Sequence, residues 1–72
     1  MASIAIMIGT AEGTRLLAFS DERKAAVATE VMLRRLPMTE LPAPVWIVCT
    51  DPEIQRRLTD YLAEVQAELL GM

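Results

Sequence analysis

The amino-acid sequence predicts an α+β domain in the order β-β-α-β-α, with two helices packed on a small three-stranded mixed sheet. Two observations predict this fold class. Three short runs are rich in apolar and β-branched residues, and two longer segments carry apolar residues at helical spacing. The expected strands are residues 3–9, 14–19 and 45–49, and the expected helices are residues 21–36 and 52–70. We expect residues 1–72 to form one small domain.

The first two strands are joined by a short turn, residues 10–13, in which Gly13 can adopt a positive φ. So short a connection favours an antiparallel hairpin. The second strand, the first helix and the third strand form a crossover unit, which predicts that these two strands run parallel. We expect the first strand in the middle of the sheet, because its apolar run is long.

The first helix is predicted to begin after Ser20-Asp21, which offers an N-cap. Pro37 ends it, because the residue before a proline avoids helical geometry. On a helical wheel, the predicted core stripe is Ala25, Ala28, Met32 and Leu36, with Thr29 and Leu33 at its margin. Val27 and Val31 lie outside that stripe. They are either simply exposed or form a second apolar strip suited to a partner surface.

The second helix has two possible N-terminal signals. Thr50 and Glu53 can form a capping box, or Asp51 can cap the helix with Pro52 at the first helical position. Gly71 is a plausible stop. The predicted buried stripe is Ile54, Leu58, Tyr61, Leu62, Val65 and Leu69. The charged residues of this segment point in other directions.

All three strands are apolar on both faces. A half-exposed strand alternates apolar and polar residues, and the runs 3–8, 16–19 and 45–49 do not. We therefore expect both sheet faces to be buried. Either the second helix covers the second face, giving a three-layer monomer, or it lies beside the first helix and leaves that face to a partner. We favour the second arrangement, a two-layer domain that forms a dimer.

Composition points to protein partners. A chain of 72 residues buries a limited share of its surface, and small domains usually add a disulfide, a metal or oligomerisation. Cys49 is the sole cysteine and histidine is absent, so we expect no disulfide and no metal. A net charge of -3 without a basic patch argues against nucleic acid. The N-terminal apolar run is too short to span a membrane and lacks a basic flank, which favours a cytoplasmic protein.

Little in the chain resembles a catalytic site. The segment 9–14 lacks the lysine and the spacing of a phosphate-binding loop, and Cys49 has no histidine to act as its base. We therefore expect no catalysis and no cofactor. A weak ligand-binding candidate consists of Thr10, Glu12, Thr50 and Asp51, because open α/β sheets bind ligands at strand ends.

The expected function is thus a small cytosolic protein-interaction module that acts by docking and forms a homodimer. Its interface is predicted on a sheet face with Trp46 and Met7, with Val27 and Val31 as secondary candidates. Two alternatives stay open at this point. One is a phage or mobile-element inhibitor that blocks a host nuclease or regulator. The other is a ligand-binding regulatory domain or small enzyme subunit.

Overall fold

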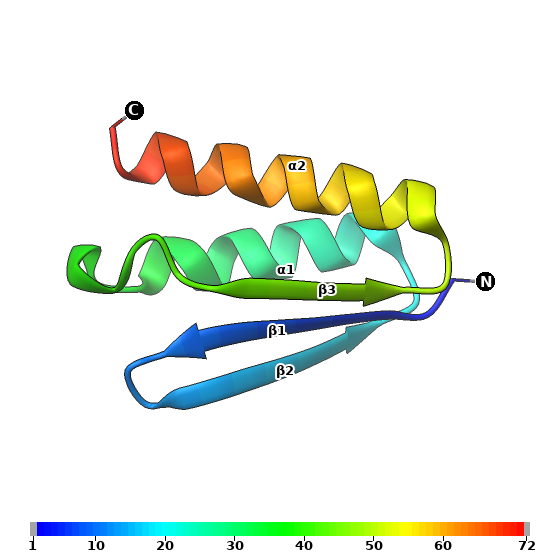
Figure 1. The fold of residues 1–72 in the computed structure, drawn as a ribbon, viewed down its shortest axis with the longest axis horizontal. Helices are drawn as coiled ribbons and strands as arrows, with labels where there is room; N and C mark the ends of the chain where they lie inside the picture. The colour runs from blue at the N-terminus through cyan, green and yellow to red at the C-terminus, as the bar shows by residue number, and fades with distance from the viewer. Residues whose placement is uncertain (1, 72) are drawn as a thin grey trace.

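A computed structural model, which describes residues 2–71, confirms the order β-β-α-β-α. The elements are β1 (Ile4–Thr10), β2 (Gly13–Phe19), α1 (Glu22–Arg35), β3 (Val45–Cys49) and α2 (Pro52–Leu69) (Figure 1). A short 3₁₀ turn, Met38–Glu40, lies in the proline-rich connection between α1 and β3. The element ends lie close to those that the sequence predicts.

β1 occupies the middle of the sheet, as its long apolar run predicted, and the strand order is β2-β1-β3. Both pairings are antiparallel: Met7 of β1 pairs with Leu16 of β2 on one side and with Trp46 of β3 on the other. β2 and β3 therefore run in the same direction, but β1 separates them. The sheet is antiparallel at every neighbouring pair, although a mixed sheet was expected.

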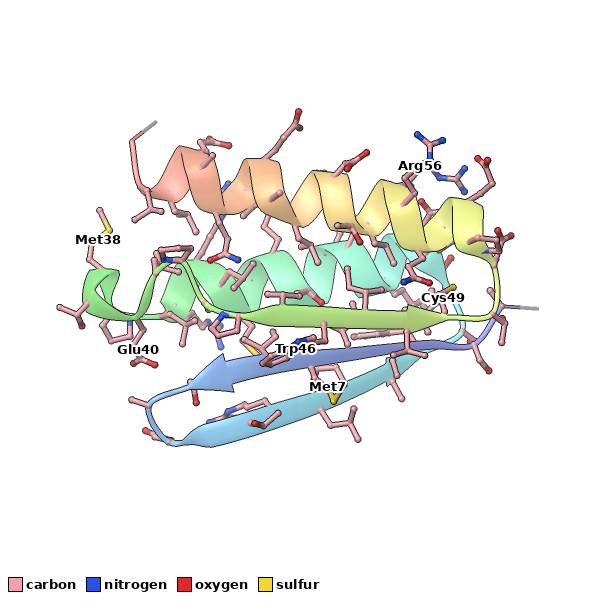
Figure 2. All side chains as sticks on the ribbon, viewed as in Figure 1. Met7, Met38, Glu40, Trp46, Cys49 and Arg56 are labelled. Carbon is pink, nitrogen blue, oxygen red and sulfur yellow. The ribbon has the colours of Figure 1, made fainter. Side chains whose placement is uncertain are left out.

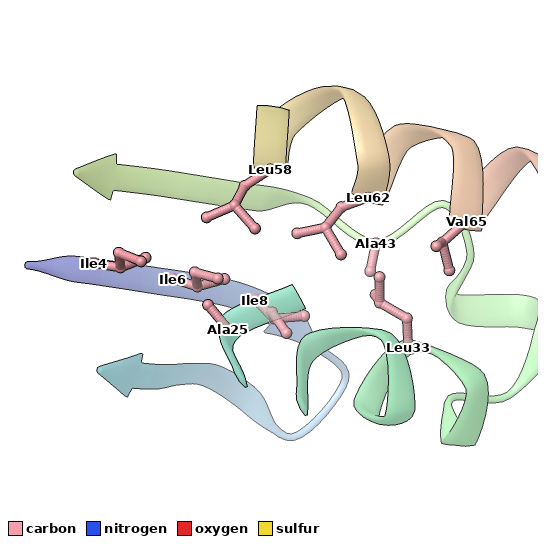
Figure 3. Close-up of a cluster of buried hydrophobic side chains, with 9 residues drawn as sticks. All are labelled: Ile4, Ile6, Ile8, Ala25, Leu33, Ala43, Leu58, Leu62 and Val65. Atoms are coloured by element: carbon pink, nitrogen blue, oxygen red, sulfur yellow. The ribbon is translucent and has the colours of Figure 1, made fainter. Parts of the chain in front are cut away.

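Both helices pack on the same face of the sheet. Ile4, Ile6 and Ile8 of β1 are buried on that face, together with Leu58 and Leu62 of α2 (Figure 3). Ala25, Leu33, Ala43 and Val65 complete the buried apolar cluster. The structure thus has two layers, one of strands and one of helices, and no helix among residues 2–71 covers the opposite sheet face.

Aspartates cap both helices. The Asp21 carboxylate accepts a hydrogen bond of 3.1 Å from the backbone N–H of Lys24 at the start of α1. The Asp51 carboxylate accepts one of 2.9 Å from the N–H of Glu53, with proline in the first turn of α2. Of the two signals that the sequence offered for α2, the structure uses Asp51. This cap satisfies N–H groups that have no partner within the helix.

The buried stripe of α1 differs from the predicted one. Ala25, Thr29 and Leu33 are fully buried, whereas Ala28, which was predicted to be in the core, is exposed. Met32 and Leu36 are partly buried against the core. The reason is the neighbouring helix: α2 packs along one side of α1, so the buried arc of α1 is rotated toward α2.

The predicted stripe of α2 is confirmed at its centre, where Leu58, Leu62 and Val65 are buried. Ile54 and Leu69 pack partly buried against the same core. Tyr61, which was predicted to belong to the stripe, is instead exposed at its edge. Its hydroxyl group reaches α1 there, so the ring lies along the seam between the helices and not in the core.

Hydrogen bonds from two side chains of α2, Arg57 and Tyr61, join the helices along their seam. The Arg57 guanidinium donates to both carboxylate oxygens of Glu22, each at 2.9 Å. The Tyr61 hydroxyl donates to the Glu30 carboxylate, which also accepts from Arg34 at 2.8 Å. The bond from Arg57 lowers the pKa of Glu22, and the bonds from Tyr61 and Arg34 lower the pKa of Glu30.

The hydroxyl of Thr29 lies in the core, and within residues 2–71 it has no hydrogen-bond partner. Burying a hydroxyl without a partner destabilises a fold. We expect Thr29→Val to raise the free energy of unfolding by about 1 kcal/mol, because it keeps the branched shape and removes the hydroxyl. Thr29→Ser keeps the hydroxyl, loses a methyl group, and should lower the same quantity by about 1 kcal/mol. Urea unfolding of both variants measures this, and a Thr29→Val protein less stable than wild type would contradict it.

The seam also predicts a pH dependence. Because the pKa of Glu30 is lower in the folded protein than its usual 4.5, its contribution to stability is complete above about pH 4.5 and is lost as pH falls through the folded value. Glu30→Gln should therefore weaken the loss of stability on acidification, leaving the part that Glu22 contributes. Urea midpoints measured from neutral to acidic pH test this. Glu64→Gln on α2 is the control, and an equal effect of both variants would contradict the assignment.

Candidate docking surface

The sheet face opposite the helices, called the open face from here on, is the most distinctive surface of the molecule. Alternate residues of a strand point to opposite faces, so the strand registers identify its members. At the paired positions these are Ala5, Met7, Gly9, Thr14, Leu16, Ala18, Trp46 and Val48. Thr14 is the one member with a hydroxyl group, and the other members are apolar residues or glycine.

Large apolar side chains of the open face are exposed to water. Leu16 is 67% exposed, Val48 61% and Trp46 51%, whereas Ile6 on the helix-covered face is 0% exposed. Scattered exposed apolar residues are normal on proteins, but these lie on the two outer strands, on either side of the partly buried Met7 of β1, and together they extend an apolar surface across the sheet. Continuous apolar surfaces on small domains mark places where other molecules bind.

The open face is not flat, because rows of large and small side chains lie next to each other. Leu16, Met7 and Trp46 lie side by side across the three strands and form a row of large side chains, the ridge row; Met7 and Trp46 are labelled in Figure 2. Two residues along, Ala18, Ala5 and Val48 form a second row of smaller side chains, the hollow row. A hollow of about 330 Å³ lies over that second row, and Ser3 and Thr50 border its outer end.

Charge is absent from the open face at the paired strand positions. The one charged residue of the three strands is Arg15, and it pairs with Ile8, which places it on the helix-covered side of the sheet. Arg15 lies within 3.6 Å of Glu12 in the adjoining turn. A partner that covers the open face therefore buries no charged side chain at the paired strand positions. The desolvation penalty of association is low for that reason.

The residues predicted for the interface lie on two separate surfaces. Met7 and Trp46 are members of the open face. Val27 and Val31 are exposed, at 53% and 43%, but they lie on α1 in the other layer of the molecule. Val31 borders a hollow of about 470 Å³ near the β1–β2 turn, which Arg15 and other charged residues also line. One flat partner surface cannot contact both pairs.

The four weak ligand candidates are not brought together. Thr10 and Glu12 lie at the β1–β2 turn, whereas Thr50 and Asp51 follow the end of β3, which lies beside the start of β1 at the opposite end of the sheet. The two threonines already have structural partners. The Thr10 hydroxyl donates to the Gly13 carbonyl at 2.7 Å. The Thr50 hydroxyl accepts from the backbone N–H of Ser3, directly before β1, at 3.0 Å. These residues therefore form no common ligand site.

Other chemical features are few. Cys49 is partly buried, and its sulfur accepts a hydrogen bond of 3.4 Å from the Asp51 N–H. Within residues 2–71, no three acidic, histidine or cysteine side chains gather closely enough to hold a metal ion. In the same part of the chain, no helix has both the length and the apolar character needed to cross a membrane.

Comparison with known proteins gives no family assignment: no family model, no curated protein and no solved structure matches this chain.

Sequence reasoning singled out only two members of the open face, Met7 and Trp46. It missed Leu16, Ala18 and Val48 as exposed residues, because the sequence pattern predicted burial on both sides of all three strands. The signal that identifies them is strand register. Met7 pairs with both Leu16 and Trp46, so these three residues lie on the same face. Because side chains alternate along a strand, each second residue from them also lies on the open face.

The two faces predict different effects for adjacent leucines of β2. Leu16 belongs to the open face, whereas Leu17 packs partly buried against the core on the other side. Leu16→Ser should change the free energy of unfolding of the monomer by at most about 0.5 kcal/mol. Leu17→Ser should lower it by about 2 kcal/mol, because it removes apolar burial from the core. Urea unfolding in dilute solution measures both, and an equal loss for the two variants would show that Leu16 is not exposed in the monomer.

Proposed function

We propose that this protein is a small protein-interaction module that acts by docking, and that it forms a homodimer through the open face. The observation that supports this is an uncharged apolar surface across all three strands, exposed on β2 and β3 and partly exposed on β1. Covering such a surface is favourable by roughly 25 cal/mol per Å² of apolar area removed from water. Docking needs no catalytic groups gathered at one site. It is therefore consistent with the finding that Thr10 and Glu12 lie far from Thr50 and Asp51.

Trp46 is expected to be the main anchor of the interface. It lies in the ridge row beside Met7 and keeps about half of its surface exposed, 51%. Tryptophan is enriched among interface residues that contribute most to binding, because its large ring removes much apolar area from water at little entropic cost. Met7 beside it is flexible enough to fill the irregular space around the ring.

A catalytic role is not part of the proposal. The carboxyl groups with lowered pKa, Glu22 and Glu30, are occupied by Arg57, Arg34 and Tyr61 at the helix seam. Structural ion pairs shift a pKa in this way without any catalytic purpose. We expect the protein in the cytoplasm, where a lone cysteine stays reduced.

Light scattering across a dilution series tests the proposal. Wild-type protein should have the mass of a dimer at high concentration and of a monomer at low concentration. Val48→Lys places a charge in the open face and should keep the protein monomeric at every concentration. Val27→Lys is the matched control, because Val27 is similarly exposed but lies on α1, and it should associate as wild type does.

Two results would contradict the proposal. The first is a wild-type protein that stays monomeric up to the highest concentration at which it is soluble. The second is a Val27→Lys protein that loses the dimer while Val48→Lys keeps it, which would move the interface from the sheet to α1.

A further inference from the structure

Two adjacent rows of the open face, the ridge row and the hollow row, are complementary to each other in shape. The ridge row presents three large side chains, Leu16, Met7 and Trp46. The hollow row directly beside it has two alanines, Ala18 and Ala5, and the hollow of about 330 Å³ lies there. A surface with one raised row and one recessed row of similar width can pack against a copy of itself.

Symmetry then selects the orientation. A two-fold axis that runs across the strands, in the plane of the interface and between the two rows, exchanges ridge and hollow. It places Met7 of one chain over Ala5 of the second copy, with the strands of the two sheets antiparallel. The same operation places Trp46 over the second copy's Val48 and Leu16 over its Ala18.

We infer that the occupant of the open face is a second copy of this chain, seated ridge row into hollow row about such an axis. This inference rests on the proposed function and specifies the register in which the two copies pack. The result is a four-layer assembly, with the two sheets inside and the helices outside. Face-to-face sheets with interdigitating side chains pack in this way, about 10 Å apart.

The other simple two-fold axis is less favourable. An axis along the strands would place Met7 over Met7 of the second copy, ridge against ridge. The hollow rows would then face each other, and the space above Ala5 and Ala18 would stay unfilled. Empty apolar space destabilises a packed interface, so ridge-to-hollow packing is favoured.

The charge distribution is compatible with a second copy as the occupant. The chain carries a net charge of -3, so two copies repel at a distance. The open face itself has no charged residue at its paired positions, and the acidic residues of α2 lie in the helix layer, on the outside of the assembly. Like charges therefore do not meet at the contact, where their repulsion would oppose association.

Area sets the expected strength. The three strands are about 4.8 Å apart and five to seven residues long. Treated as a flat rectangle, the open face therefore covers roughly a few hundred Å² per chain. Stable interfaces bury about 800 Å² per partner. The self-association should therefore be weak and reversible.

A size-exchange experiment on β1 tests the register. Met7→Ala removes the centre of the ridge, and Ala5→Met fills the centre of the hollow. Each variant alone should associate about tenfold more weakly than wild type, because one leaves space empty and the other makes two large side chains collide.

An equimolar mixture of the two variants should restore the fit. At one contact of the mixed dimer, the shortened side chain at position 7 of the first variant faces the enlarged side chain at position 5 of the second. The native pair faces at the other contact, so the mixed dimer should recover wild-type affinity within about threefold. Sedimentation velocity of each variant and of the mixture, with circular dichroism to check folding, measures this.

Each outcome is decisive. A mixture that binds more tightly than both variants supports the register. A mixture that binds no more tightly than the variants alone, with wild type still dimeric and still sensitive to Val48→Lys, overturns the register and leaves the proposed function standing. A wild-type protein that is monomeric throughout overturns both.

Discussion

The packing of Ile4, Ile6 and Ile8 against both helices is the contact on which the rest of the structure depends. These side chains alternate along the central strand, so all three lie on one face and are almost fully buried. Leu58 and Leu62 of α2 complete the same cluster, and Ala25 and Leu33 of α1 join it (Figure 3). Because both helices are used on this side, no helix of residues 2–71 covers the other side of β1.

That asymmetry explains the open face. Between its isoleucines, β1 carries Ala5 and Met7, which lie among apolar residues of the two outer strands. A sheet with one wet face would have polar residues at those positions. Their apolar character on an uncovered face is the physical basis for the proposed docking function, and the alternation of large and small rows is the basis for the inferred register.

Much of the fold could be predicted from the sequence. Helix ends followed from Asp21, Pro37 and Asp51, because capping and proline geometry are local effects. The stripe of α1 was displaced, since the position of α2 beside it depends on long-range packing that a single helical wheel does not contain. The ligand candidates failed for a similar reason: strand register, not spacing in the sequence, decides that Thr10 and Thr50 lie at opposite ends of the sheet.

The central claim, that a second protein surface covers the open face, is tested most directly by the fluorescence of Trp46. It is the only tryptophan of the chain, and it lies in the ridge row. On dilution, we expect its emission to shift to longer wavelength and its quenching by acrylamide to increase, with the same midpoint as the fall in mass from dimer to monomer. An emission spectrum and quenching constant that stay unchanged across the concentration range in which the mass changes would contradict the account.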